Sequence, residues 1–232
     1  AGDVLGGNMR LAAYPPGKGD ITNMIRSYIH RCQKDGVKIV MNCEVTPELI
    51  KEEKPDSVII ATGSKTLILP IEGIDNPAII HGSDLLDGKR AAGKKVLVVG
   101  GGMVGCETAA FLGEQEHDVT VIEFRDTVGA DVIHEHRVYL MKDFEDYGIK
   151  EITGAKVCKF YEDGVEYETA DGQRHETRGY DSVILSMGFR NYNPLEEKIK
   201  DLVPETHVIG DAIRARRALD ATKEAYEVAS RI

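Results

Sequence analysis

The chain has 232 residues, of which 42% are hydrophobic and 29% are charged, as in ordinary globular proteins and unlike disordered ones. Its 39 acidic residues outnumber the 29 basic ones, and the formal charge of -10 makes nucleic acid and anionic lipid poor partners. The sequence has neither an apolar run long enough to span a membrane nor a signal-peptide pattern at its start, so we expect a cytoplasmic protein.

The four cysteines are far apart in the sequence and include no C-x-x-C pair. This spacing indicates neither a disulfide framework, nor a zinc site, nor a redox-active dithiol, and we expect reduced, partly buried thiols. His134 and His136 are two residues apart on an expected helix, where they would lie on different faces. We therefore expect no metal site.

The first eighty residues or so alternate helical and extended patterns. Gly6-Gly7 indicates a turn or a close backbone approach, and the small residues Ala61–Ser64 also allow the backbone to come close to a ligand. Leu67–Gly73, which a proline interrupts, is expected to be a crossover. The expected elements here are a helix from Asp20 to about Gly36, a strand over Val37–Met41, a short helix over Thr46–Lys51 and a strand over Ser57–Ile60.

The most informative stretch is Lys94–Glu123. Val96–Val99 is a short, mostly β-branched run suited to a strand that is buried on both faces. The glycines after it fit a G-x-G-x-x-G pattern. Gly100 permits a tight turn, Gly102 admits a pyrophosphate, and Gly105 lets the following helix pack closely on the strand. The N–H groups and dipole of that helix form an anion site without any Lys or Arg, and neither occurs in the turn or the helix.

The second strand of this unit, Val119–Ile122, ends at Glu123. About twenty residues past the glycines, a carboxylate can accept hydrogen bonds from the adenosine ribose and repel a 2′-phosphate, so we expect NADH over NADPH. Arg125 would favour NADPH if it turned toward that phosphate. The alternative is a glycine-rich turn with a structural role only. The candidate contacts of NAD(H) are Gly100, Gly102, Met103, Val104, Gly105, Glu123, Phe124, Arg125 and Gly188.

After Glu123 the chain is expected to form a helix and a meander before it returns to the outer domain. Asp163-Gly164 and Asp171-Gly172 are hairpin signals. The expected elements are a helix from Ile133 to about Gly148, strands over Thr153–Phe160, Val165–Thr169, Gln173–Arg178 and Asp181–Leu185, a crossover at Asn191–Pro194, and a last helix over Arg217–Ile232 with Ala218, Leu219, Ala221, Ala225 and Val228 on its inner face.

These elements predict an α/β fold. A Rossmann-like NAD(P)-binding domain, residues 81–190, would be inserted into a partial FAD-binding-like α/β domain formed by residues 1–80 and 191–232. The outer domain has the order of a second nucleotide fold whose beginning is missing. We therefore expect an exposed sheet edge there and self-association of the chain.

Four motifs in this order, LGGNMRLAAYPPGK, ATGS, VVGGGMVGCE and VIGDAIRARRALDA, resemble flavin-dependent pyridine nucleotide oxidoreductases over essentially the whole chain. The narrower resemblance is to the C-terminal part of 2-enoate and 2,4-dienoyl-CoA reductases, which are relatives of Old Yellow Enzyme. In that family an N-terminal barrel carries FMN and an iron–sulfur cluster, and an FAD domain with an inserted NAD(P) domain follows. The barrel, the cluster cysteines and the family's earlier glycine motif are missing here, so the resemblance implies a fragment of a longer parent.

The resemblance also implies an outer FAD site. Asp211 would accept a hydrogen bond from a ribityl hydroxyl; alternatively it caps the region of the last helix, and Arg217 is merely solvated. Glu107 would lie near the nicotinamide ribose, and an ordinary acid in the first turn of a helix is an equal alternative. The positions that match the family's FAD contacts are Gly6, Gly7, Asn8, Ala61, Thr62, Gly63, Gly210, Asp211, Arg217 and Ala218.

The resemblance implies an electron-input module that binds NADH and passes hydride to FAD, for reduction of an enoate-type substrate elsewhere in the parent. Hydride transfer depends on the orientation of two rings, so we expect no catalytic acid or base. The alternative is a nucleotide-binding domain without electron transfer. Without the first FAD motif, the isolated chain is expected to be inactive and colourless and yet to bind NAD(H). Dinucleotides and the upstream barrel are the expected partners.

Overall fold

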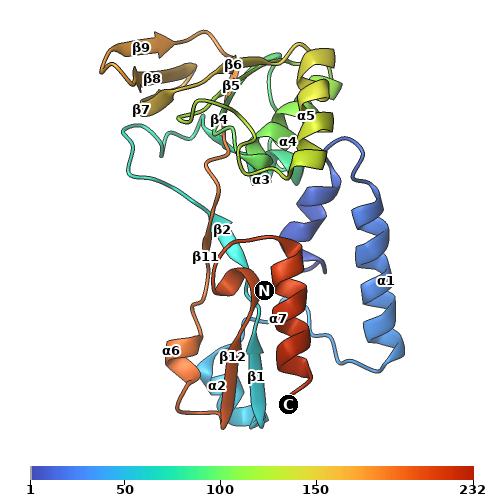
Figure 1. The fold of residues 1–232 in the computed structure, drawn as a ribbon. Coiled ribbons are helices and arrows are strands. Elements are labelled where there is room, and N and C mark those ends of the chain that lie inside the picture. Colours follow the sequence, from blue (N-terminus) through green and yellow to red (C-terminus); the bar gives the residue numbers. More distant parts are fainter. Residues whose placement is uncertain (1) are drawn as a thin grey trace. The chain divides into compact units, whose positions relative to one another are not determined.

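A computed structural model describes residues 2–232 (Figure 1). The chain forms two compact units. The outer unit comprises the residues up to Arg10, Ile21–Lys65 and Phe189–Ile232, and the central unit comprises Leu11–Asp20 and Thr66–Gly188. The boundaries after residues 65 and 188 differ from those expected near 80 and 190, because the first crossover groups with the central unit.

A five-stranded parallel sheet forms the middle of the central unit, in the order β3-β10-β4-β5-β6. β4 (Lys95–Val99) pairs with β5 (Asp118–Ile122) on one side and with β10 (Ser182–Leu185) on the other, and the registers bring their last residues side by side. The carboxyl ends of these three strands therefore lie together at one edge of the sheet. The outermost strands are β3 (Ile80–His81) and β6 (Lys150–Ile152).

The two faces of this sheet carry separate hydrophobic cores, because side chains alternate along each strand. Val96 and Val98 belong to one cluster, with residues of α4 and α5, and Leu97 and Val99 belong to the other, with residues of an antiparallel meander. Each of the four side chains is at most 2% exposed, so the predicted two-sided burial of this strand is confirmed. The elements around the sheet are α3 (Gly82–Leu86), α4 (Met103–Glu114), α5 (His134–Asp146), β7 (Ala155–Tyr161), β8 (Gly164–Thr169) and β9 (Arg174–Thr177).

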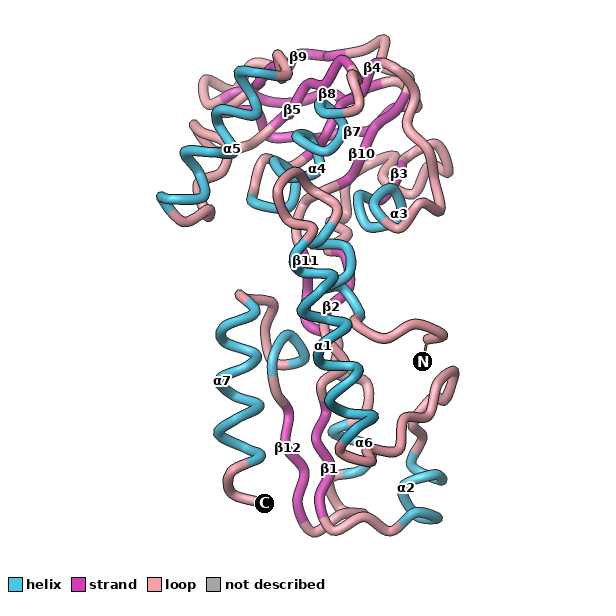
Figure 2. Tube along the Cα trace, turned by 90° about the vertical axis from the view of Figure 1, so that its right-hand side faces the viewer, coloured by secondary structure: helices cyan, strands magenta, loops and turns pink. Residues whose placement is uncertain are grey.

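The outer unit contains a parallel pair of strands, β1 (Ser57–Ile60) and β12 (Glu205–Val208), which both views show side by side (Figures 1 and 2). A second pair joins β2 to β11. A small core forms around Ile60, which is 2% exposed, together with Ile50 and Ile199 from the neighbouring helices. Three further elements cross the boundary between the units: a 3-10 helix (Gly7–Ala13), α1 (Asp20–Lys34) and β2 (Ser64–Thr66). The other elements of the outer unit are α2 (Pro47–Glu53), β11 (Phe189–Asn191), α6 (Glu196–Ile199), a 3-10 turn (Gly210–Ala212) and α7 (Ala218–Ala229).

Most of the predicted helices and strands are confirmed, with ends shifted by a few residues. The strand predicted over Val37–Met41 is wrong. This segment pairs with no other strand in the described part of the chain, and Val37 and Val40 are 54% and 58% exposed. Apolar alternation is only one requirement of a strand, because its backbone N–H and C=O groups must also find a partner.

The predicted inner face of the last helix is also partly wrong. Leu219 is 76% exposed and Ala218 is exposed as well, whereas Ala221, Ala225 and Val228 are half-buried. The buried face of α7 therefore begins about one turn later than expected. Ala218 and Leu219 occupy the exposed first turn of the helix.

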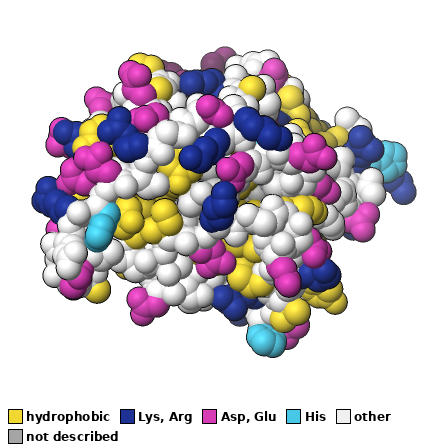
Figure 3. All heavy atoms as spheres, turned by 90° about the horizontal axis from the view of Figure 1, so that it is seen from above, with side chains coloured by type: hydrophobic (Ala, Val, Ile, Leu, Met, Phe, Trp, Pro, Cys, Tyr) yellow, Lys and Arg dark blue, Asp and Glu magenta, His cyan; other side chains and the backbone are white. Residues whose placement is uncertain are grey.

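The surface carries both signs of charge. Figure 3 shows acidic and basic side chains interleaved over one face of the molecule. On the meander, Arg174 Nη1 lies 2.9 Å from Glu166 Oε1, and Arg178 Nη2 lies 2.6 Å from Asp163 Oδ1. Exposed pairs of this kind contribute little stability each. In residues 2–232, every helix is too short or too polar to cross a bilayer.

Candidate dinucleotide site

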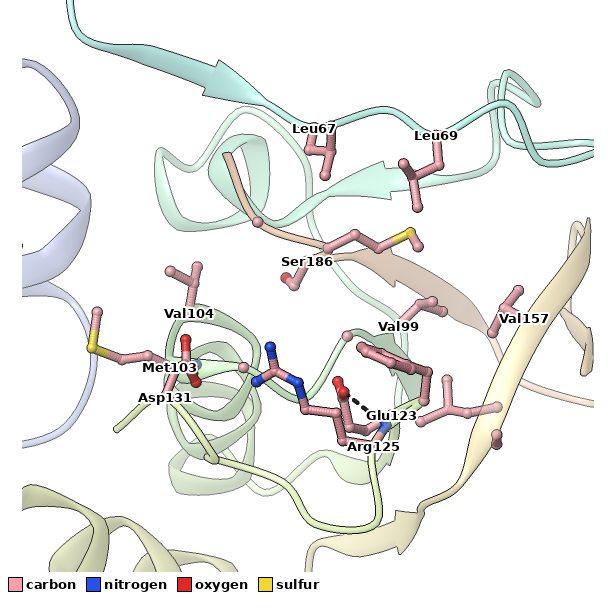
Figure 4. A pocket seen from close by; sticks show the side chains of 17 residues that line it. Leu67, Leu69, Val99, Met103, Val104, Glu123, Arg125, Asp131, Val157 and Ser186 are labelled. Atoms are coloured by element: carbon pink, nitrogen blue, oxygen red, sulfur yellow. Dashed lines mark hydrogen bonds between the residues drawn. The ribbon is translucent and has the colours of Figure 1, made fainter. Parts of the chain in front are cut away.

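A pocket of about 350 Å³ opens at the carboxyl ends of β4, β5 and β10 (Figure 4). Its walls include the residues that directly follow these strands: Gly100 after β4, Glu123–Arg125 after β5, and Ser186–Gly188 after β10. The strand order reverses at β4, because β5 and β6 follow on one side and β10 and β3 lie on the other. In open parallel sheets, such a reversal leaves a crevice in which ligands bind. The fold therefore places a candidate binding site here.

The glycine turn after β4 requires glycine at two positions for structural reasons. Gly100 has a φ of 105°, and a Cβ there would lie 2.4 Å from the carbonyl oxygen of Ser186. A Cβ on Gly105 would lie only 1.8 Å from the carbonyl oxygen of Gly100. The predicted roles of these glycines in the tight turn and in the close packing of α4 are therefore confirmed.

Gly102 differs from its two neighbours in the motif. Its φ of −73° suits any residue, and the nearest atom to a Cβ there would be Asp131 Oδ2, at 3.3 Å. Because Gly102 also lines the pocket, a side chain at this position would take up room beside it. The need for glycine here is thus better explained by a ligand that approaches the backbone than by packing within the protein.

Asp131 caps the first turn of α4 from a distant point in the sequence. The N–H of Met103 donates a hydrogen bond to Asp131 Oδ1 at 2.9 Å. A carboxylate is favourable at this position because the helix dipole leaves positive charge at the N-terminus. Sequence reasoning missed Asp131, since it follows neither the glycine motif nor the end of a strand.

Glu123 is buried and ties the end of β5 to the glycine turn. Its side chain accepts a hydrogen bond from the N–H of Gly101 at 2.6 Å. It accepts another from the N–H of Arg125 at 3.0 Å, which Figure 4 marks with a dashed line. These two bonds compensate for burial of the charge, since the residue is only 7% exposed. An ionised carboxylate has about four acceptor positions, so about two remain for the hydroxyls of a ribose.

Most of the candidate NAD(H) contacts lie together in this pocket. Phe124 is 64% exposed, and Arg125 extends toward the part of the pocket where Met103 and Asp131 lie (Figure 4). Gly105 lies behind the turn. The predicted residues that line the pocket are Gly100, Gly102, Met103, Val104, Glu123, Phe124, Arg125 and Gly188. The lining residues that sequence reasoning missed are Leu67, Leu69, Val99, Ile122, Asp131, Ala155, Val157, Ser186 and Met187.

Glu107 does not line the pocket; it takes part in a separate ionic cluster. Its side chain is 7% exposed, and Oε1 contacts both the ammonium group of Lys18 and, at 3.2 Å, Nε2 of His136. The expected place of Glu107 beside the nicotinamide ribose stays a prediction. Lys18 lies in the PPGK motif, but its spacing from Glu107 gave no signal of the contact.

Cys106 supports the glycine turn from beneath. Its Sγ lies 3.2 Å from the carbonyl oxygen of Gly101, and the residue is buried. Burial is the main cause that raises the pKa of this thiol to about 12. The thiol therefore stays protonated and is not a nucleophile at neutral pH. In the described residues all four cysteines are free, and Cys32 is exposed rather than partly buried.

In the outer unit, three of the predicted segments meet in one chain of hydrogen bonds. Asn8 Nδ2 donates to the carbonyl oxygen of Ser64 at 3.2 Å, and Ser64 Oγ donates to Asp211 Oδ2 at 2.9 Å. Asp211 Oδ1 accepts from the N–H of Arg216 at 3.1 Å. The structure thus brings Asn8, the turn after β1 and Asp211 together.

The other outer candidates have backbone roles or stay at the surface. Gly6, Gly63 and Gly210 have positive φ values of 110°, 75° and 60°. The hydroxyl of Thr62 donates to the carbonyl oxygen of Tyr192, and Ala61 and Gly7 are exposed. Arg217 and Ala218 are exposed at the start of α7, where Asp220, not Asp211, accepts a hydrogen bond from the N–H of Arg217.

The groups around the pocket fit a dinucleotide. A helix N-terminus and a glycine with no Cβ suit a pyrophosphate, and a buried carboxylate with unused acceptor positions suits a ribose. No cluster of side chains in the described residues could hold a metal ion.

Comparisons with known proteins agree with this chemistry. Residues 17–209 match the family model described as pyridine nucleotide-disulphide oxidoreductase. Over 98% of this chain, a cinnamate reductase of Clostridium sporogenes is 31% identical and an NADH oxidase of Thermoanaerobacter brockii is 32% identical. A solved 2-naphthoyl-CoA reductase superposes on the whole chain with a TM-score of 0.93 and 31% identity.

The chain spans about a third of the length of these relatives: 34% of the cinnamate reductase, 36% of the NADH oxidase and 35% of the 2-naphthoyl-CoA reductase. The resemblance to enoate-type reductases and the predicted α/β fold are both confirmed. The chain belongs to the pyridine nucleotide-disulphide oxidoreductase family, which implies binding of FAD and NAD(P).

Proposed function

We propose that this chain is the electron-input part of a longer flavin-dependent reductase, and that its central unit binds NAD(H). The observation that carries the proposal is the shared pocket: the glycine turn, the N-terminus of α4 and the buried Glu123 all line one cavity at the carboxyl ends of parallel strands. Each of these groups suits one part of a dinucleotide.

The residues of the central unit would bind and orient. Gly102 gives the pyrophosphate access to the backbone, and the N-terminus of α4 supplies N–H donors and a favourable dipole. Glu123 would accept hydrogen bonds from the adenosine ribose with the acceptor positions left free by Gly101 and Arg125. The apolar side chains Leu67, Leu69 and Val157 would keep water away from the ring systems.

The outer unit is proposed to hold part of an FAD. Asn8, the turn at Ala61–Ser64 and Asp211 offer an amide, backbone groups and a carboxylate, which suit hydroxyls and a flavin edge rather than a metal. When both cofactors are bound, the nicotinamide would supply a hydride, two electrons and a proton, to the flavin. No side chain of this chain needs to move a proton in that step, because the rate of hydride transfer depends on how closely the two rings are held and oriented.

The final acceptor would be reduced elsewhere in the parent. The names of the relatives, cinnamate reductase and 2-naphthoyl-CoA reductase, favour an enoate-type or aryl-CoA substrate. A barrel with FMN and an iron–sulfur cluster would carry the electrons onward and would be the main protein partner of this chain. NADH is the proposed donor, in preference to NADPH, because Glu123 would face the 2′-phosphate of NADPH.

The test has two arms. In the first, the 232-residue chain is titrated with NADH by calorimetry, and we expect saturable binding at one site. In the second, NADH is added anaerobically to the full-length parent, and we expect the flavin absorbance to bleach. Binding without bleaching would favour the alternative, a nucleotide-binding domain without electron transfer. No binding in the first arm would contradict the proposal.

Self-association of the chain is part of the proposal. The outer unit leaves Val37, Val40, Leu219 and Tyr226 between 54% and 76% exposed, and apolar surface of this kind favours association. Sedimentation over a wide range of concentration should show a mass that rises with concentration. A mass of one chain at every concentration would contradict this part.

A further inference from the structure

One carboxylate in the pocket opposes the ligand that the pocket fits. Asp131 lines the cavity beside the glycine turn, and it is exposed. Its Oδ1 accepts the hydrogen bond of the Met103 N–H, and its Oδ2 would lie 3.3 Å from a Cβ on Gly102. The Asp131 side chain thus occupies the N–H of Met103 and also lies beside Gly102, where a pyrophosphate would approach the backbone.

The loop that carries Asp131 is anchored on both sides of it. Val128 and Val132 are 1% and 8% exposed, and the N–H of Gly129 donates to the carbonyl oxygen of Gly101 at 2.7 Å. Arg137 Nη2 donates to the carbonyl oxygen of Val128 at 3.1 Å. Because these contacts fix the backbone, the Asp131 side chain can turn toward solvent without movement of the loop.

A carboxylate and a phosphate interact with a helix N-terminus for the same reason. Both are anions that accept hydrogen bonds from free N–H groups and that the helix dipole attracts. They cannot share the Met103 N–H, and like charges at this distance repel each other. A ligand must therefore displace the carboxylate to reach this N–H.

We infer that Asp131 is a built-in competitor of the pyrophosphate and lowers the affinity of the pocket for dinucleotides. This inference rests on the proposed function, since it concerns the same pocket. When no ligand is bound, Asp131 caps α4; when a dinucleotide binds, the phosphate replaces it and the side chain turns outward. The residue tunes the affinity of the site and is not a catalytic residue.

A purely structural cap would behave differently from a competitor. Asn is about as good a helix cap as Asp, so Asp131→Asn keeps an oxygen acceptor for the Met103 N–H and removes the charge. The fold should therefore survive the change. Asp126→Asn is the matched control, because Asp126 is an exposed acid on the same loop and does not line the pocket.

The experiment is a calorimetric titration of the full chain and both variants with NADH. We expect Asp131→Asn to bind about fivefold more tightly than the unmutated chain, which is the scale of one charge at a helix N-terminus. Asp126→Asn should leave the dissociation constant unchanged. Equal or weaker binding by Asp131→Asn, or an equal gain in both variants, would overturn the inference.

A second measurement follows the hydrogen bond itself. The chain has six methionines, so selective 15N labelling gives few amide signals and allows assignment of Met103 by substitution. Saturation with NADH should shift the Met103 amide in the unmutated chain, and the Asp131→Ala variant should already show a shifted signal without ligand. An unmoved Met103 amide at saturating NADH would contradict displacement. Failure of the unmutated chain to bind NADH at all would instead contradict the proposed function.

Discussion

The ammonium group of Lys18 pairs with the carboxylate of Glu107, which lies 89 residues later in the chain, and His136 contacts the same oxygen atom at 3.2 Å. This pairing joins the segment Leu11–Asp20 to the second turn of α4 within the central unit. It also explains why Glu107 is absent from the pocket. A buried carboxylate needs compensating charge, and here the ammonium group of Lys18 supplies it.

Replacement of Lys18 by Met should destabilise the central unit. The change leaves the buried Glu107 carboxylate with His136 alone, and we expect a loss of roughly 2 kcal/mol, below the range for a fully buried pair because Lys18 is partly exposed. Urea unfolding monitored by circular dichroism gives the free energy of unfolding. The double variant Glu107→Gln with Lys18→Met should lose less unfolding free energy than the sum of the losses in the two single variants, because the ion pair is lost only once.

The control for this prediction is Lys142→Met. Lys142 forms an exposed pair with Asp146, with 2.7 Å between Nζ and Oδ2, and exposed pairs contribute little. The variant should unfold at the same urea concentration as the unmutated chain. If Lys18→Met behaved like this control, the Glu107 cluster would have no structural role.

Two glycines of the same turn should respond differently to alanine. Gly105→Ala places a Cβ 1.8 Å from the carbonyl oxygen of Gly100, so α4 must move away from β4 at a cost of about 3 kcal/mol. Gly102→Ala meets no atom nearer than 3.3 Å and should cost about 1 kcal/mol or less. The Gly102 variant should nevertheless bind NADH on the order of tenfold more weakly.

The comparison requires both measurements on both variants, namely urea unfolding and calorimetric titration with NADH. Normal NADH affinity in Gly102→Ala would show that no ligand approaches this backbone. Normal stability in Gly105→Ala would show that the helix does not pack against the turn in the way described here.

The unmutated chain should bind NADH at least about tenfold more tightly than NADPH, because the buried Glu123 carboxylate would face the extra phosphate. Glu123→Gln should bring the affinities for NADH and NADPH close together. Arg125→Ala should instead increase the preference for NADH, because Arg125 is the only Lys or Arg among the pocket-lining residues of the described chain. Parallel titrations with both cofactors give the ratio, which is more informative than either affinity. Equal or tighter binding of NADPH by the unmutated chain would refute the prediction.

Cys106 should make stability depend on pH in the alkaline range. Burial raises its pKa from the ordinary value of 9.0 to about 12, so the folded chain holds this proton more tightly than the unfolded chain. The resulting stabilisation is fully present below pH 9 and is lost as the pH rises toward 12. The difference in unfolding free energy between the unmutated chain and Cys106→Ala should therefore shrink over this interval.

The same burial predicts the reactivity of the thiols. At pH 8, Ellman's reagent should modify the exposed Cys32 quickly and should modify Cys106 only after unfolding in urea. Mass spectrometry of a partially modified sample identifies the sites. Fast modification of Cys106 in the folded chain would contradict its burial beneath the glycine turn.

Local sequence predicts the dinucleotide motif well because its determinants are close together. The strand over Val96–Val99, the turn at Gly100 and Gly105, and the acid at Glu123 all follow from spacing and side-chain size. Those signals depend on contacts within about thirty residues, and they also set the carboxyl edge at which the pocket lies.

Contacts between residues that do not belong to one recognised motif were the ones that sequence reasoning missed. Asp131 reaches Met103 across 28 positions, and Lys18 reaches Glu107 across 89, and nothing in the spacing of the pairs indicates either contact. The strand predicted over Val37–Met41 is wrong for a related reason, namely that a local pattern does not show whether a partner strand is present. Its pattern was suitable, but pairing depends on whether another strand is nearby, and that is a property of the whole fold.

The two ends of the segment Thr66–Gly188 are neighbours, since the N–H of Leu67 donates to the carbonyl oxygen of Gly188 at 2.9 Å. The outer unit is therefore interrupted by this segment at a single point, because the chain leaves and returns to it at neighbouring residues. When the segment Thr66–Gly188 is folded, the entropic cost of joining its two ends does not depend on how many residues it contains. This hydrogen bond thus fixes where the segment leaves the outer unit and where it returns, whatever the length of the chain between the two points.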